Sequence, residues 1–378
     1  MKLLSLTFRD KTSNWAIEKI DFNEVTLLVG ASGVGKTKIL KALLSLRNLT
    51  LGRSMNKDSL CISWELKFIE DKFIYTWSGE TERSEYDSLY NEEDRAEGSV
   101  FINEKLIIQT KTDTPKVIFH REKNEVVFDD DKAPKVTSTQ SCINIFSDEE
   151  LIKPIKKGFK KMFFFNFEQE KMRRITEIKM VHEGDFNEAL AFDKMREINN
   201  PLLGKLAIAY EYFPRVFEQI KNQYMDVFHF VEDIRFQKST ITIENKELLI
   251  LDLQIKEEGC DWISYIEMSS GMLKTLLYIG LINLVPDSSI ILIDEFENSL
   301  GVNCIDLHLD TNFAENTQFI LTSHHPYIIN SMPMETWKII SRHAGNVIAR
   351  NASDYNLGKS KHEAFKQLMN IEAYLEGR

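Results

Sequence analysis

The sequence has few cysteines, no long apolar run and no excess of basic residues. Its four cysteines include no C-x-x-C pair, which argues against a zinc knuckle and a disulfide framework. The longest apolar stretch, residues 276–285, contains Asn283 and is far shorter than the roughly 20 residues of a membrane span. A net charge of −11 argues against a surface that coats nucleic acid throughout. We therefore expect a cytoplasmic protein with reduced thiols and no membrane contact.

The composition predicts a folded chain of more than one domain. With 43% hydrophobic and 28% charged residues it can bury a sizeable core. Strand patterns dominate residues 1–147, a helical pattern residues 148–235, and alternating strands and helices residues 236–378. This order predicts an α/β fold with a mixed, mostly parallel sheet, an antiparallel β subdomain and a helical insertion.

The strand and helix patterns can be placed along the chain. Strands are expected at 2–8, 25–29, 61–69, 72–77, 106–109, 117–120, 125–128, 240–243, 248–255, 290–293, 318–322 and 337–340, and helices at 35–46, 273–284 and 361–375.

A phosphate-binding loop follows the strand at 25–29. The segment Gly30, Ala31, Ser32, Gly33, Val34, Gly35, Lys36 and Thr37 matches G-x-x-x-x-G-K-[ST]. Its glycines let backbone N–H groups surround a phosphate, and the helix that follows adds its positive dipole end. Lys36 is expected to neutralise the β- and γ-phosphates, and the Thr37 hydroxyl to ligate Mg²⁺. The motif predicts an ATP·Mg²⁺ site.

A second motif ends the buried strand at 290–293. Asp294 follows this strand directly, where a carboxylate can hold the Mg²⁺ shell beside the phosphate loop. Glu295 comes next and is placed to accept a proton from a water that attacks the γ-phosphate. The pair predicts ATP hydrolysis with Glu295 as the general base.

Two further segments restrict the class. Ser269, Ser270 and Gly271 begin an apolar helix 25 positions before Asp294 and offer a second phosphate-binding device at a helix N-terminus. A symmetric dimer lets this device close on the nucleotide of a partner chain. The strand at 318–322 ends in Thr322-Ser323-His324-His325-Pro326, and His324 is expected to reach the γ-phosphate.

This ordered set resembles the ABC-type P-loop ATPases. Residues 30–37 match their Walker A motif, 269–271 their signature, 294–295 their Walker B motif, 294–300 their D-loop region and His324 their switch histidine. Within that superfamily the chain resembles the prokaryotic ATPases related to the overcoming-lysogenization-defect (OLD-like) nucleases and to the chromosome-maintenance (SMC) and break-repair ATPases. The resemblance implies a homodimer that closes around ATP, acting in phage defence beside a separately encoded effector.

The chain departs from those relatives at several points. Its Met-Ser-Ser-Gly-Met sequence replaces the Leu-Ser-Gly-Gly-Gln of transporters, which argues against a transport subunit. Only 54 residues follow His324, too few for the nuclease domain of the nuclease-bearing relatives, so no nuclease activity is expected. Gln140 is the candidate for the Mg²⁺-sensing glutamine, with a surface loop glutamine as the alternative. Arg9 is a candidate nucleotide contact or a solvated arginine.

The basic residues between 153 and 174 have two possible interpretations. A predicted helix carries Lys153, Lys156, Lys157, Lys160 and Lys161, and Lys171, Arg173 and Arg174 follow it. These residues form either a patch that contacts the DNA backbone or a solvated helix face. The aromatic run at 163–167 is expected to be buried core.

The sequence favours an ATPase whose hydrolysis opens the dimer and thereby switches a DNA-linked or anti-phage process. The alternative is a nucleotide-gated scaffold, in which bound ATP holds an effector assembly and turnover is incidental. Both predict the same motifs.

Overall fold

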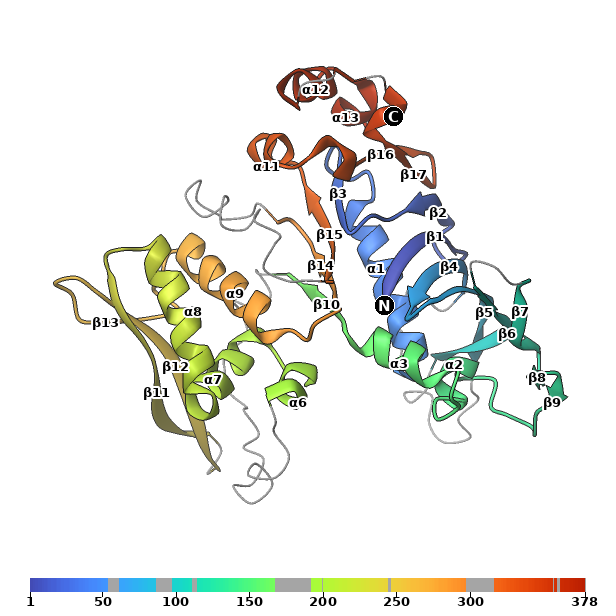
Figure 1. Cartoon of the computed structure of the whole chain (residues 1–378), viewed down its shortest axis with the longest axis horizontal. Coiled ribbons are helices and arrows are strands. Elements are labelled where there is room, and N and C mark those ends of the chain that lie inside the picture. The colour runs from blue at the N-terminus through green and yellow to red at the C-terminus, as the bar shows by residue number, and fades with distance from the viewer. Residues whose placement is uncertain are drawn as a thin grey trace. The chain divides into compact units, whose positions relative to one another are not determined.

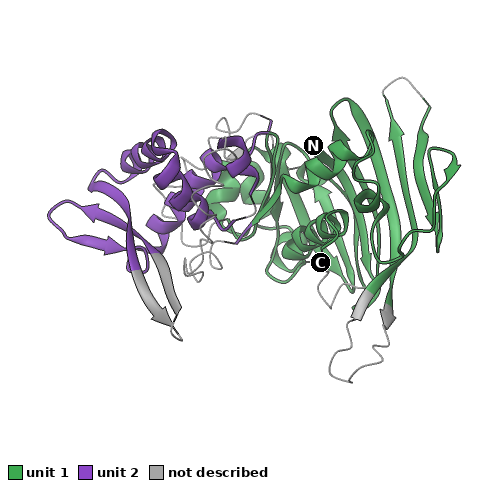
Figure 2. Ribbon diagram, turned by 90° about the horizontal axis from the view of Figure 1, so that it is seen from below, with its two compact units in different colours: residues 1–164, 288–296, 317–378 green, residues 165–287, 297–316 purple. Residues whose placement is uncertain are grey.

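The chain forms two compact units (Figure 2). A computed structural model describes residues 1–53, 61–85, 97–110, 114–166, 192–198, 200–243, 246–296, 316–355, 357–358 and 361–377. The first unit comprises residues 1–164, 288–296 and 317–378, and the second residues 165–287 and 297–316. The chain thus passes between the units repeatedly, and the boundaries differ from the sequence-based ones.

A large mixed sheet dominates the first unit (Figure 1). Its order, within the described residues, is β10-β14-β15-β3-β16-β17-β2-β1-β4-β5-β6-β7-β8-β9. The strands are β1 Lys2–Asp10, β2 Trp15–Asp21, β3 Val25–Val29, β4 Ile62–Glu70, β5 Phe73–Glu85, β6 Glu97–Gln109, β7 Lys116–Glu122, β8 Glu125–Phe128, β9 Asp131–Lys132, β10 Met162–Phe165, β14 Ile290–Ile293, β15 Gln318–Ser323, β16 Trp337–His343 and β17 Asn346–Asn351. The expected α/β class is confirmed, with the antiparallel strands continuing the same sheet.

Strand β3 lies between β15 and β16 in the parallel part of this sheet. It pairs with β15 from Val25 opposite Phe319 to Val29 opposite Ser323, and with β16 over its last three residues. Strand β14 continues the parallel part on the other side of β15. Because parallel strands end at the same edge, the segments that follow β3, β14 and β15 meet there. The Walker A, Walker B and histidine motifs follow these three strands.

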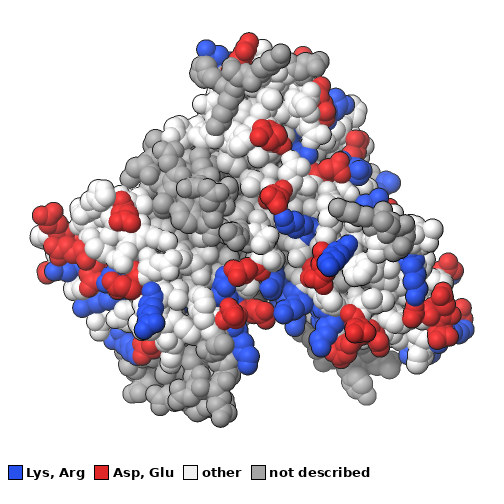
Figure 3. All heavy atoms as spheres, viewed as in Figure 1, with Lys and Arg blue, Asp and Glu red and all other residues white. Residues whose placement is uncertain are grey.

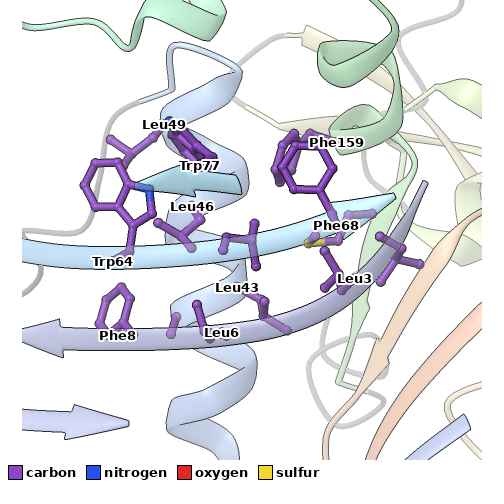
Figure 4. Packing of buried hydrophobic residues seen from close by; sticks show 14 of the residues in the cluster. Leu3, Leu6, Phe8, Leu43, Leu46, Leu49, Trp64, Phe68, Trp77 and Phe159 are labelled. Carbon is purple, nitrogen blue, oxygen red and sulfur yellow. The ribbon is translucent and has the colours of Figure 1, made fainter. Parts of the chain in front are cut away.

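Helix α1 (Lys36–Thr50) covers part of this sheet. Its residues Ile39, Leu40, Leu43 and Leu46 recur at helical spacing and are fully buried. Figure 4 shows the packing of Leu43, Leu46 and Leu49 with Leu3, Leu6, Phe8, Trp64, Phe68, Trp77 and Phe159. The helix is longer than expected from the sequence because this apolar stripe continues to Leu49.

The antiparallel wing contains a buried charge pair. Glu104 on β6 and Arg121 on β7 have no exposed side-chain surface and lie 3.9 Å apart. Glu104 accepts hydrogen bonds from Trp77 Nε1, the Ser141 hydroxyl and the Cys142 amide. Arg121 donates to two carbonyls within residues 137–140. The pair fixes this connection between the wing and the short helix α2 (Cys142–Ile145).

The second unit combines helices with a small antiparallel sheet. Its elements are α6 Phe192–Glu197, α7 Leu202–Tyr212, α8 Pro214–Val227, β11 Val231–Ile243, β12 Lys246–Glu257, β13 Trp262–Ser264 and α9 Ser270–Leu284. Strand β12 lies between β11 and β13. Helices α7 and α8 contact α9, whose side chains are buried along most of its length. Among the described residues no helix is both long and apolar enough to cross a membrane.

Three sequence predictions change in detail. Strands β2 and β17 were not expected, and they join the parallel centre of the sheet to its antiparallel wing. The expected final helix is divided into α12 (Lys361–Leu368) and α13 (Glu372–Leu375). Asn370 lies at the break and donates its side-chain amide to the Lys366 carbonyl, as a helix-ending residue does. The aromatic run enters the sheet as β10, with Phe163 and Phe165 buried as expected.

Candidate functional site: a glycine loop and a carboxylate at the sheet edge

The phosphate loop turns sharply between β3 and α1. Gly30 has φ +149°, and a Cβ there would lie 2.4 Å from the carbonyl oxygen of Ile340. Gly35 has φ +111°, and its Cβ would lie 2.7 Å from Val347. Only glycine fits both positions, because side chains are disfavoured at these φ values and β16 and β17 leave no room. The loop therefore rests directly on the β16–β17 hairpin.

Helix α1 begins without a side-chain cap. Gly35 is its N-cap residue and has no side chain to bond the first-turn amides. These N–H groups point out of the helix end into the loop, where the helix dipole is positive. Such an end is suited to a phosphate group.

Lys36 places its ammonium group within the loop. Its Nζ donates to the carbonyl oxygens of Gly30 at 2.7 Å and Ala31 at 2.9 Å. The side chain thus folds over the segment that would surround a phosphate. This position agrees with the charge-neutralising function expected from the motif.

Thr37 and Asp294 meet at the carboxyl edge of the sheet. Thr37 Oγ1 donates to Asp294 Oδ1 at 3.0 Å, although the residues are 257 positions apart. The Asp294 side chain lies at the end of β14 and is 7% exposed. Mg²⁺ prefers hard oxygen ligands and retains several waters when protein ligands are few. A hydroxyl and a carboxylate at this distance fit such an ion.

The oxygen atoms of Thr37 and Asp294 are ligands of the kind that Mg²⁺ takes, with few protein ligands and several waters. Within the described residues, no three His, Cys, Asp or Glu side chains are grouped to hold a metal. Thr37 and Asp294 would supply the protein ligands of a bound Mg²⁺, and phosphate oxygens and water the remaining ones.

Thr322 is a site residue to which the sequence interpretation gave no function. Its hydroxyl donates to Asp294 Oδ1 at 2.8 Å and accepts from the Glu295 amide at 2.7 Å. Its carbonyl accepts from the Phe296 amide at 3.0 Å. Thr322 therefore fixes the three residues that follow β14. A threonine ending a buried strand beside the aspartate strand is the signal that could have identified it.

Glu295 is held in an unusual backbone conformation. Its φ is +51°, and its side chain is exposed while Phe296 is fully buried. Left-handed backbone at a non-glycine residue is costly and is concentrated at functional sites. The buried Phe296 and the bond to Thr322 stabilise this turn and direct Glu295 outward.

The structure separates the two adjacent histidines. His325 is the N-cap of α11 (Pro326–Ser331), and its Nδ1 accepts from the Tyr327 amide at 3.2 Å. His324 is exposed directly after β15, at the edge that carries Asp294. The His325 ring therefore caps a helix, whereas His324 is the histidine expected from the sequence to reach the γ-phosphate.

The signature segment lies in the second unit. Ser269 is the N-cap of α9, and its hydroxyl accepts from the Met272 amide at 3.2 Å. Ser269 and Ser270 are exposed, and Gly271 is half-buried. This geometry gives an exposed helix N-terminus, as the motif predicts.

Gln140 is not brought to the other site residues. Its Oε1 accepts from Asn144 Nδ2 at 3.2 Å, and that amide lies beside Gly52. Gly52 follows the last turn of α1, whereas Thr37 is in the first turn. At 1.5 Å per residue the helix separates these ends by about 20 Å. The expected contact between Gln140 and a metal at Thr37 is therefore absent from this arrangement.

The remaining candidates take ordinary positions or lie beyond the described residues. Arg9 is exposed on β1, and its guanidinium is 3.5 Å from Asn14 Oδ1. The D-loop residues 297–300 and the basic residues Lys171, Arg173 and Arg174 lie outside the described part of the chain.

Comparisons with known proteins give one family match, over part of this chain. Residues 206–330 match a family model described as "AAA domain, putative AbiEii toxin, Type IV TA system". The matched third of the chain includes the signature, Asp294, Glu295 and His324. A search of curated proteins gives no match.

Solved structures similar to this chain include SMC heads. An Smc head bound to the C-terminal winged-helix domain of ScpA is 15% identical, with a TM-score of 0.46, over 93% of this chain and 98% of that one. An Smc head with an extended coiled coil, bound to the C-terminal domain of ScpA derived from Pyrococcus furiosus, is 14% identical, with a TM-score of 0.45, over 94% and 98%. The SMC head domain from Thermotoga maritima is 14% identical, with a TM-score of 0.42, over 93% and 99%.

Proposed function

We propose that this chain is an ABC-type ATPase that binds ATP with Mg²⁺, hydrolyses it and uses the cycle as a switch. The hydrogen bond between Thr37 and Asp294 carries the proposal, because it joins the Walker A and Walker B segments. A glycine loop with an enclosed lysine, beside a hydroxyl and a carboxylate, is the set of groups that phosphoryl transfer requires.

The proposed reaction assigns one task to each side chain. Lys36 and the loop amides neutralise the β- and γ-phosphates, and Thr37 and Asp294 would hold Mg²⁺, which when bound would stabilise charge on the phosphate oxygens. Glu295 takes a proton from water as the water oxygen bonds to the γ-phosphorus. The bond from that phosphorus to the β–γ bridging oxygen breaks, and its electron pair leaves with ADP.

Two substitutions test this chemistry separately. Lys36→Ala should abolish binding of a fluorescent ATP analogue, because it removes the cation within the loop. Glu295→Gln should retain binding and reduce hydrolysis at least 100-fold. Nucleotide binding by the Lys36 variant would contradict the phosphate site, and hydrolysis at the wild-type rate in the Glu295 variant would contradict the base.

The proposed switch is an ATP-dependent homodimer. Ser269 and its neighbours present an exposed helix N-terminus in the second unit. In a two-fold dimer this end would contact the γ-phosphate bound to the partner chain. The Glu295→Gln protein, measured by light scattering, should change from monomer to dimer when ATP·Mg²⁺ is added. A mass that nucleotide does not change would favour the nucleotide-gated scaffold.

Substitution of Ser269 tests the dimer more sharply. Ser269→Arg places a bulky cation at the proposed contact and should prevent ATP-driven pairing while leaving nucleotide binding by the monomer intact. Because Ser269 also caps α9, Ser269→Ala is the control that removes the cap alone. Normal pairing of the arginine variant would contradict a contact in trans.

The biological process is proposed from two observations. The matching family is described as a putative toxin of a type IV TA system, which supports anti-phage defence with a separately encoded partner. Helix α3 (Lys153–Lys160) exposes Lys153, Lys157 and Lys160, which supports contact with the DNA backbone. On the face seen in Figure 3, basic and acidic side chains are interspersed.

Salt dependence tests the DNA contact. The affinity for duplex DNA falls as salt rises, and the steepness of this fall counts the phosphates that the protein neutralises. Reversing the charge of Lys153, Lys157 and Lys160 together should reduce the magnitude of the slope of log affinity against log salt by about 3, roughly one for each lost phosphate contact. A control with three exposed lysines elsewhere in the first unit carries Lys72→Glu, Lys105→Glu and Lys123→Glu. Equal effects of the two sets would show that only net charge matters.

A further inference from the structure

The chain's last described segment ends against the phosphate loop. Helix α13 contacts β16, and the C-terminal end lies beside that strand (Figure 1). Gly377 has φ +72°, and a Cβ on it would lie 2.3 Å from Val34 Cγ1 and 3.7 Å from the Ala31 Cβ. Two residues of the loop thus have Gly377 as a neighbour.

The backbone of this segment is fixed at both sides. The Arg342 amide donates to the Gly377 carbonyl at 2.7 Å, and the Gly377 amide donates to the Glu372 carbonyl at 3.1 Å. Arg342 belongs to β16, the strand whose Ile340 carbonyl abuts Gly30. The phosphate loop therefore lies against β16 and against the segment around Gly377 that is hydrogen-bonded to β16.

The same segment reaches the histidine motif. Tyr374 is 8% exposed, and its hydroxyl donates to the His324 carbonyl at 3.4 Å. Residues 371–377, which we term the C-terminal strap, thus contact both the phosphate loop and the residue proposed to sense the γ-phosphate. The phosphate loop and the histidine motif are far apart in the sequence.

Val34 explains why contact with the strap matters to the loop. It is 4% exposed and lies between Gly33 and Gly35, which both have positive φ. Glycines permit many backbone conformations, so the packing of the side chain between them restricts the loop. The missing Cβ of Gly377 leaves the space that the Val34 side chain occupies.

We propose that the C-terminal strap is a positioning element of the nucleotide site: Gly377 holds the phosphate loop through Val34, and Tyr374 holds the main chain of His324. The inference rests on the proposed ATPase function and adds to it two residues outside the recognised motifs. It predicts that nucleotide affinity depends on Gly377 and that the rate of hydrolysis depends on Tyr374.

A matched pair of glycine substitutions tests the first half. Gly377→Ala should raise the Kd for a fluorescent ATP analogue at least tenfold, because the added methyl must displace Val34. Gly259 in the second unit has φ +73°, and a Cβ there would meet nothing within 4 Å. Gly259→Ala thus carries the same backbone strain without the contact and should leave the Kd within twofold of wild type.

A compensating substitution distinguishes contact from misfolding. Val34→Ala removes the atom that Gly377→Ala would strike, so the double variant should bind nucleotide within threefold of Val34→Ala alone. Equal Kd values for wild type and Gly377→Ala, or a loss that Val34→Ala does not relieve, would overturn the proposal. If the wild-type chain failed to bind ATP, the proposed function itself would be contradicted.

Tyr374→Phe tests the second half. Loss of one hydroxyl should leave the Kd unchanged and lower kcat by threefold or more, because the His324 main chain loses its bond. In a His324→Ala background the same substitution should have no further effect on kcat. An equal decrease in both backgrounds, or no decrease in either, would show that Tyr374 does not act through His324.

Discussion

Thr322 holds Asp294 in position, since its Oγ1 donates a 2.8 Å hydrogen bond to the Asp294 Oδ1 atom. The same Oδ1 atom also accepts a hydrogen bond from the Thr37 hydroxyl, and the Thr322 hydroxyl accepts one from the Glu295 amide. One hydroxyl group thereby joins the proposed metal ligand to the proposed base. Such supporting contacts determine how well a site is pre-organised.

Thr322→Val should slow ATP hydrolysis by about 10–100-fold, the usual cost of losing a supporting bond at a metal site. Nucleotide affinity should change little, because the phosphate loop is untouched. Steady-state kinetics and fluorescent nucleotide binding measure the two effects. Thr275→Val is the control, since its hydroxyl donates to the Gly271 carbonyl at 2.9 Å within α9. Unchanged kcat in the Thr322 variant would contradict its function.

Asp294 and Gln140 should differ in their effect on Mg²⁺ dependence. Asp294→Asn should raise the Mg²⁺ concentration for half-maximal activity by about 10–100-fold, because an amide is a weaker metal ligand. Gln140→Ala should change it less than twofold, because Gln140 lies at the far end of α1. A large shift in the Gln140 variant would mean that this segment moves to the site during turnover.

The motifs can be recognised in the sequence because each combines a backbone requirement with a chemical one. The buried strand, the glycines and Lys36 identify the phosphate loop without knowledge of distant contacts. Gln140 shows the limit of that approach, since a loop glutamine has no local pattern that indicates where its side chain lies. Strands β2 and β17 were missed for a related reason: exposed polar residues such as Glu18 and Arg350 obscure their alternation.

Glu104→Gln should destabilise the first unit by about 2–4 kcal/mol. All the groups bonded to this carboxylate are donors, so one N–H of the new amide would face another donor, and Arg121 would lose its buried partner. Urea unfolding measures the change. Glu65→Gln on strand β4 is the control, because Glu65 is half exposed and should contribute less than about 0.5 kcal/mol. Similar losses in both variants would argue against the network.

The second unit should gain stability as the pH rises from about 8 to 10. Burial, with a smaller contribution from Arg196, lowers the pKa of Lys205 to about 8. Between this pKa and the unfolded value near 10.4, only the unfolded chain holds the proton. Unfolding then takes up a proton, so stability increases with pH, by about 2 kcal/mol over the range.

Urea unfolding between pH 7.5 and 10 checks this slope, and Lys205→Met should flatten it. Lys221→Met is the comparison, because partial burial lowers the pKa of Lys221 but the carboxylates of Glu218 and Asp233 together outweigh it and raise this pKa. The Lys221 variant should therefore retain the slope. A slope that persists in the Lys205 variant would assign the titration to another group.

The sheet that carries the phosphate loop restricts the order in which the newly made chain can fold. Strand β3 needs β15 and β16 as neighbours, and Leu3 hydrogen bonds to Gln318, 315 residues later. At the usual rates of about 5–20 residues per second, the ribosome takes tens of seconds to supply these partners. The elements from α6 to α9 are complete in the nascent chain before these partners are. Most of the second unit is therefore synthesised before the nucleotide site can form.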